Sequence, residues 1–186
     1  MSPPRPLTRV PAAPGSLGVD SLLRPTGVAL AFADRALPPD LIEELYALMA
    51  TGPGMTGASP ARIVFATSAV AKTRLATGLD LAGQTAAFDA PACAIIAYDR
   101  EFAEQMLAFA ADDFDGRSCL DEPVRLQAAV LRTSLLQGAY LAVSARALGL
   151  EIAFLPGFDV AAVTAAFFPE PGLEVIFVAA LGFPAD

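Results

Sequence analysis

The chain has 186 residues, of which 55% are hydrophobic and 17% charged, and its net charge is −8. This length suits one domain with a substantial core, and the apolar composition favours self-association, so we expect a homodimer. Scattered basic residues argue against a nucleic-acid partner, and the apolar runs are too short to cross a bilayer. The chain lacks histidine, which excludes Ser-His and Cys-His catalysis and removes the commonest metal ligand, so we predict no metal site.

The N-terminal stretch and the cysteines bear on organisation and compartment. Residues 1–18 are rich in proline and small residues and lack the apolar core of a signal sequence, so we expect a flexible arm. Residues 19–186 are then predicted to form a single domain. Cys93 lies in an apolar run and Cys119 in a polar stretch. This pattern suggests no disulfide framework and favours a cytoplasmic protein.

Apolar periodicity predicts a mixture of helices and strands without strict alternation, which favours an α+β fold. The run 91–98 is almost continuously apolar, as is typical of a central strand. The stretch 122–148 is apolar or small on nearly all sides, which predicts a buried helix. The expected elements, in chain order, are a helix over 39–50, a strand over 62–67, a helix over 69–84 capped by Ser68, a strand over 91–98, a helix over 100–111, a helix over 122–148, a strand over 151–155, a helix over 159–168 and a strand over 173–181.

Three motifs could carry a site. Residues 52–57 fit the pattern Gly-x-Gly-x-x-Gly, but a helix precedes them and a strand follows, the reverse of a dinucleotide-binding unit, and Pro53 lacks an amide hydrogen. We therefore interpret them as a connector. The acidic stretch 112–115 lacks the spacing of a calcium loop and is interpreted as a solvated loop. The polar residues 132–134 in the long helix contact either a structural interface or a ligand, and both interpretations stay open.

Several short sequences occur in an order and spacing typical of one family. They are Leu-Tyr-Ala-Leu-Met at 45–49, Gly-Pro at 52–53, Ser-Pro-Ala-Arg-Ile-Val-Phe at 59–65, Asp-Gly-Arg-Ser at 115–118, Gln-Gly-Ala-Tyr-Leu at 137–141, Arg-Ala-Leu-Gly-Leu at 146–150, Gly-Phe-Asp at 157–159 and Ala-Phe-Phe at 166–168. The likeness that they carry extends roughly over residues 22 to 183. In this respect the chain resembles the nitroreductase superfamily, and within it the branch that contains malonic semialdehyde reductase.

The resemblance implies a fold and an activity. The fold would be an α+β homodimer of entwined protomers, with a central mixed sheet flanked by helices and a long buried helix at the dimer interface. FMN at the interface would take hydride from NAD(P)H and pass it to a small acceptor, such as a semialdehyde, nitro or quinone-like compound. The chain would therefore be an NAD(P)H-dependent flavin oxidoreductase. Its candidate cofactor contacts are Arg24, Ser59, Pro60, Arg62 and Gly157, and Arg117 is a candidate contact for an acidic substrate.

The chain also departs from the family pattern. The segment 26–32 lacks the arginines that bind the FMN phosphate, although Arg24 lies nearby. Gly57 stands where relatives have asparagine, and Pro156, aligned with an amide that faces flavin N5, has no N–H, which leaves Gly157 to serve instead. Each lost hydrogen bond costs about 1–3 kcal/mol.

These departures leave two alternatives open. One is a flavin-free homologue that keeps the scaffold and acts as a binding or partner subunit. The other is a flavin without phosphate, which would need an apolar pocket around residues 26–32. A purely structural role for the candidate residues also stays open, with Ser59 capping a turn and Arg62 forming a surface ion pair.

Overall fold

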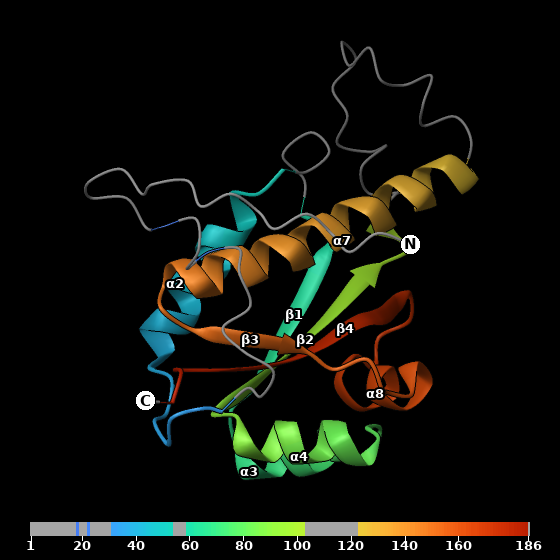
Figure 1. Cartoon of the computed structure of the whole chain (residues 1–186). Coiled ribbons are helices and arrows are strands. Elements are labelled where there is room, and N and C mark those ends of the chain that lie inside the picture. Colours follow the sequence, from blue (N-terminus) through green and yellow to red (C-terminus); the bar gives the residue numbers. More distant parts are fainter. Residues whose placement is uncertain (1–17, 19–21, 23–30, 54–58, 103–122, 186) are drawn as a thin grey trace, which may run out of the picture.

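The computed structural model describes residues 18, 22, 31–53, 59–102 and 123–185. Figure 1 shows how the elements of these residues are arranged. They are α2 (Pro39–Ala50), β1 (Ala61–Ala66), α3 (Ala69–Ala76), α4 (Leu81–Asp89), β2 (Ala92–Asp99), α7 (Pro123–Ala147), β3 (Glu151–Phe154), α8 (Val160–Phe167) and β4 (Leu173–Gly182). None of the described helices has the length and apolar character needed to span a membrane.

The four strands form one sheet in the order β1-β2-β4-β3. All three pairings are antiparallel, whereas a mixed sheet was expected. The predicted α+β class is confirmed. So is the prediction that the apolar run 91–98 forms a central strand, because β2 lies between β1 and β4 and is buried along nearly its whole length.

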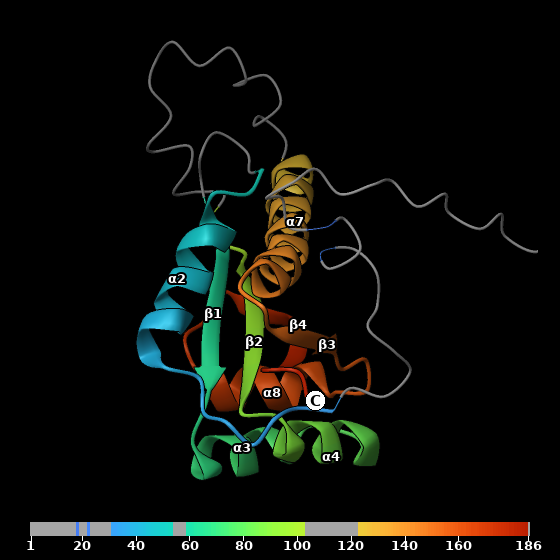
Figure 2. The ribbon, with the colours of Figure 1, turned by 60° about the vertical axis from the view of Figure 1, so that its left-hand side comes forward.

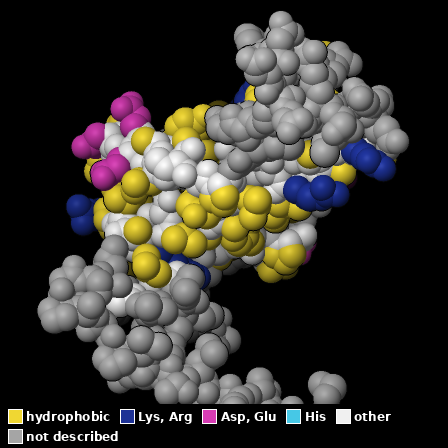
Figure 3. Space-filling model, turned by 90° about the horizontal axis from the view of Figure 1, so that it is seen from above, with side chains coloured by type: hydrophobic (Ala, Val, Ile, Leu, Met, Phe, Trp, Pro, Cys, Tyr) yellow, Lys and Arg dark blue, Asp and Glu magenta, His cyan; other side chains and the backbone are white. Residues whose placement is uncertain are grey.

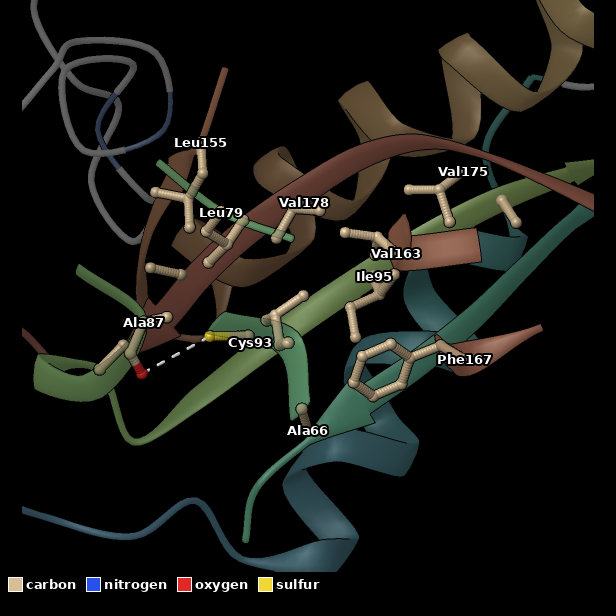
Figure 4. Packing of buried hydrophobic residues seen from close by; sticks show 14 of the residues in the cluster. Ala66, Leu79, Ala87, Cys93, Ile95, Leu155, Val163, Phe167, Val175 and Val178 are labelled. Carbon is tan, nitrogen blue, oxygen red and sulfur yellow. Dashed lines mark hydrogen bonds between the residues drawn. The ribbon is translucent and has the colours of Figure 1, made fainter. Parts of the chain in front are cut away.

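Helices cover both faces of the sheet (Figures 1 and 2). Alternate residues of β2 serve the two faces, because side chains alternate along a strand. Ala92, Ala94 and Ile96 pack in the cluster that contains residues of α2 and α7. Cys93 and Ile95 pack in the opposite cluster, where Figure 4 shows them with residues that include Leu79, Val163, Phe167, Val175 and Val178. One strand thus supplies both layers of the core.

The predicted helix over 69–84 is wrong, because the structure has two helices there, α3 and α4. Ser68 caps α3 as predicted, accepting the Ala71 N–H at 3.2 Å. The break comes at Asp80, which starts α4 by accepting the Gly83 N–H at 2.7 Å. Leu79, just before it, forms an isolated bridge with Phe158. A local cap and a long-range bridge therefore override the helical periodicity.

Helix α7 has 25 residues and lies close to its predicted position. It packs on the sheet and on α2, but within the single chain it is not buried on every side. Leu135, Leu136, Tyr140 and Val143 are exposed, and Leu136 exposes 46% of its surface. Figure 3 looks onto the α7 side of the molecule and shows hydrophobic side chains gathered there. The predicted burial of this helix therefore needs a second surface.

Several predicted segments lie outside the described residues. They are residues 1–17 of the arm predicted over 1–18, the acidic stretch 112–115 and the part of the helix predicted over 100–111 that follows Phe102.

Candidate functional site

The segment that enters β1 is fixed to α7 by Gln137. The Ala61 N–H donates to Gln137 Oε1 at 3.0 Å, and Gln137 Nε2 donates to Ser59 Oγ at 2.6 Å. Gln137 is only 3% exposed, and Pro60, between its two partners, is fully buried. Because Gln137 projects from the middle of α7, the long helix sets the position of Ser59 relative to the sheet.

The residues before the predicted loop also contact α7. The end of α2 is closed by bonds from the Thr51 and Gly52 N–H groups to carbonyls of its last turn. A Cβ atom at Gly52 would lie 2.6 Å from Cγ of the Tyr140 ring, so only glycine fits this contact. Tyr140 is three residues after Gln137, about one helical turn. Neighbouring turns of α7 therefore hold Gly52 and Ser59, while Gly57 lies outside the described residues.

Arg62, a candidate cofactor contact, is engaged in an ion pair. Its Nη2 lies 3.1 Å from Asp99 Oδ2, and its Nη1 donates to the Ser59 carbonyl at 3.0 Å. Asp99 is nearly buried, and its Oδ1 accepts the N–H groups of Glu101 and Phe102. The Arg62 side chain is 39% exposed, but its charge is balanced by Asp99. This geometry matches the ion-pair interpretation and ties the end of β2 to the start of β1.

Gly157 lies against the α3–α4 connection. Its carbonyl accepts the Asp80 N–H at 2.8 Å, and a Cβ atom at residue 157 would lie 1.8 Å from Asp80 Oδ2. Pro156, the residue before it, is exposed. The chain reaches Gly157 from β3, at the opposite edge of the sheet from β1. Among the described residues, no contact therefore brings Gly157 together with Ser59, Pro60 or Arg62 within one chain.

The polar residues 132–134 of α7 divide into two kinds. Thr133 and Ser134 are buried, and Ser134 Oγ donates to the Val130 carbonyl at 3.0 Å, which is a structural role. Arg132 is exposed, and no acidic group in the described part of the chain pairs with it. It lies four residues before Leu136 and eight before Tyr140, so the three share one face of the helix. A cation therefore stands beside the exposed apolar side chains of α7.

A separate cleft of about 340 Å³ lies near the start of β2. Phe32, the last residue of the segment expected to form an apolar pocket, lines it together with Arg35, Lys72, Asp34 and Asp89. The two cations, Arg35 and Lys72, balance the two carboxylates, Asp34 and Asp89. Ser59 instead precedes β1 at Ala61, whose partner Tyr98 is near the other end of β2, so the cleft and Ser59 lie at different ends of the sheet.

Arg24 and Arg117 lie outside the described residues. Sequence reasoning missed the role of Gln137, although a glutamine in the largely apolar stretch 135–147 of this helix has to find hydrogen-bond partners if it is buried. This need for partners was the signal in the sequence that could have identified Gln137.

The described residues are equipped for binding more than for acid–base chemistry. No group of acidic or cysteine side chains among them is arranged to hold a metal ion. Burial raises the pKa of the Cys93 thiol to about 11, although the Lys72 cation opposes the shift. Cys93 is therefore a protonated core residue near neutral pH. On α7 and the segment before β1, the candidate binding groups are the Ser59 hydroxyl, the exposed apolar side chains and the Arg132 cation.

The chain is 39% identical over 166 residues to a protein of Stenotrophomonas maltophilia named as an NADH dehydrogenase/NAD(P)H nitroreductase. The matched region is 89% of this chain and 84% of that relative. The chain belongs to the nitroreductase family. No protein-family model matches it, and the malonic semialdehyde reductase branch stays a prediction.

Solved structures confirm the nitroreductase fold. One is a nitroreductase in complex with FMN from Exiguobacterium sibiricum, with a TM-score of 0.70, 15% identity and coverage of 84% of this chain and 83% of that one. Another is an NAD(P)H:FMN oxidoreductase from Staphylococcus epidermidis, with a TM-score of 0.69, 19% identity and coverage of 84% and 82%. The names of these two proteins and of the bacterial relative carry the word "putative".

Proposed function

We propose that this nitroreductase-family protein is an NAD(P)H-dependent flavin oxidoreductase that passes hydride to a small acceptor such as a semialdehyde, nitro or quinone-like compound. The observation that carries the proposal is the 39% identity, over most of both chains, with a relative named as an NAD(P)H nitroreductase. The lack of histidine fits this chemistry, because a flavin supplies the hydride step and the protein supplies position and electrostatics.

FMN is the cofactor that we propose, and the described residues suit parts of it. The partly exposed Ser59 hydroxyl can hydrogen-bond a polar ring atom, and the exposed face of α7 around Leu136 and Tyr140 can exclude water from an apolar ring. The Arg132 cation, which no described acidic group neutralises, can attract a phosphate. Arg62 is committed to Asp99 and is not assigned to the phosphate. Arg24 and Arg117 stay predicted contacts, and Gly157 stays one whose contribution would come from the other edge of the sheet.

A homodimer in the cytoplasm completes the proposal. A second copy of the chain would cover the exposed apolar side chains of α7, which a lone chain leaves in contact with water. Such a partner would also allow residues from opposite edges of the sheet to approach one cofactor. The cytoplasmic assignment follows from the two isolated cysteines of the sequence.

Titration of the purified protein with FMN tests the proposal. We expect flavin fluorescence to be quenched to saturation at one FMN per chain and the visible flavin spectrum to shift on binding. Size-exclusion chromatography with light scattering measures the dimer in the same sample. A protein that stays colourless after incubation with excess FMN and desalting, and that quenches no fluorescence, would overturn the proposal.

A further inference from the structure

Gln137 fixes the direction of the hydrogen bond made by the Ser59 hydroxyl. The Ala61 N–H can only donate, so the Gln137 atom that faces it at 3.0 Å is the carbonyl oxygen Oε1. The other end of the amide is then the NH₂ group, which can only donate, and it meets Ser59 Oγ at 2.6 Å. Ser59 Oγ is therefore the acceptor, and its own hydrogen points away from Gln137.

The Ser59 hydroxyl hydrogen has no acceptor in the described part of the chain. Two hydrogen bonds engage Ser59 there: Oγ accepts from Gln137, and the backbone carbonyl accepts from Arg62 Nη1. Ser59 is partly exposed, so a bound molecule can reach its hydroxyl. A hydroxyl whose oxygen is held by a buried amide is a donor prepared in advance, which lowers the cost of ordering it on binding.

We propose that Ser59 donates its hydroxyl hydrogen to an acceptor atom of the flavin, a ring carbonyl oxygen or a ring nitrogen, and that Gln137 is the positioning residue that sets this direction. The inference rests on the flavin-dependent function proposed above. Gln137 is 3% exposed, so it acts on the ligand only through Ser59.

The variant Gln137→Glu reverses the hydrogen bond without a large change in shape. An ionised carboxylate accepts from both the Ala61 N–H and the Ser59 O–H, so the hydroxyl turns inward and presents lone pairs to the flavin. When the introduced carboxyl group is protonated, it instead donates to Ser59 and restores the original direction. Burial raises the pKa of a glutamate, which brings this change into an accessible range of pH. In this single variant, the pH therefore sets the direction of the hydrogen bond to Ser59.

The experiment measures the Kd for FMN by flavin fluorescence, with each variant compared with wild type at the same pH. At about pH 8 we expect Gln137→Glu to bind FMN about tenfold more weakly than wild type, and at about pH 5.5 within about twofold of it. Ser59→Ala should lose about tenfold at both pH values, and Gln137→Glu should add nothing in the Ser59→Ala background. Gln137→Met removes the amide but leaves Ser59 free to donate, so it should weaken binding less than Gln137→Glu does.

Circular dichroism establishes that each variant is folded. If Gln137→Glu does not fold, the pair Ser59→Ala and Ser59→Thr decides, because threonine keeps a hydroxyl and should recover the affinity that alanine loses. Ser59→Ala with wild-type affinity would overturn the inference, as would a pH-independent loss in Gln137→Glu that Gln137→Met matches. Failure of the wild-type protein to bind FMN is a different result, which removes the proposed function together with this inference.

Discussion

Asp80 contacts Gly157 through both its backbone and its side chain. The Asp80 N–H donates to the Gly157 carbonyl at 2.8 Å, and the Asp80 carboxylate occupies the space where a Cβ atom of residue 157 would lie. The same carboxylate accepts the Gly83 N–H and so starts α4. The segment after β3 is thereby fixed to the layer formed by α3, α4 and α8, and Gly157 has a structural reason to be glycine whether or not it contacts a flavin.

Gly157→Ala should lower the free energy of unfolding by about 1–3 kcal/mol, because the new methyl group displaces Asp80 from its capping position. Urea denaturation measures the change. The matched control is the same substitution in an Asp80→Ala background, where the cap is already lost and the added cost should be small. An equal cost in both backgrounds would show that the Asp80 contact is not the cause.

Arg132→Gln should weaken FMN binding by about three- to tenfold at low salt, because an exposed cation with no acidic partner among the described residues attracts the phosphate without holding the fold together. The loss should shrink as salt is added, and thermal stability should stay close to that of wild type. Isothermal titration at two salt concentrations, together with a melting curve, measures both effects.

Arg62→Gln is the matched control, because it removes the same charge from an arginine that is already paired. It should lower stability by about 1 kcal/mol, a modest value for a pair in which Arg62 is partly exposed, and change FMN affinity less than Arg132→Gln does. The opposite ranking, with Arg62 dominant for FMN and Arg132 dominant for stability, would contradict the assignment of the two side chains.

Because the Cys93 thiol is buried, we expect the protein to lose stability at alkaline pH. Its folded-state pKa is raised from 9.0 to about 11 by burial. The contribution of this thiol to the free energy of unfolding is therefore fully present below pH 9.0. It is lost as the pH rises to about 11, because the thiol ionises at a lower pH in the unfolded chain than in the folded one. The total loss of unfolding free energy from this group should approach about 2–3 kcal/mol. Denaturation of wild type and Cys93→Ala across this range isolates the effect, since the variant lacks this thiol. Parallel curves for the two proteins would contradict it.

The departures from the family pattern can be reversed. Gly27→Arg and Gly57→Asn introduce the side chains that the family resemblance predicts at these positions, so each should tighten FMN binding, together by about tenfold or more. Thr73→Arg adds the same charge at an exposed position of α3 and serves as the control for net charge. Equal effects of Gly27→Arg and Thr73→Arg would indicate general electrostatics, and no effect of either restored side chain would count against the alignment.

Elements whose signals are local were predictable from the sequence. The continuous apolar run of β2 and the length of α7 were both visible, because burial on two faces and helical periodicity leave a direct pattern. The break between α3 and α4 was missed, since the Asp80 cap is accompanied there by the Leu79–Phe158 bridge, whose partner comes from a distant segment.

In the candidate site, too, the local motifs were predictable and the long-range contacts were not. The ordered motifs located Ser59 and Arg62, but Ser59 meets Gln137 across 78 residues of sequence and Arg62 meets Asp99 across 37. No periodicity encodes such pairs, so the identity of the Arg62 partner and the fixed direction of the Ser59 hydroxyl came only from the structure. The exposed face of α7 was likewise hidden, because its side chains are as apolar as those facing the sheet.

Anaerobic reduction of the FMN-loaded protein by NADH or NADPH tests the central claim most directly. We expect the flavin absorbance to bleach in a single turnover that consumes one NAD(P)H per flavin, and to return when a nitro, quinone-like or semialdehyde acceptor is added. Bound flavin that neither NADH nor NADPH reduces under these conditions would contradict the proposed oxidoreductase activity.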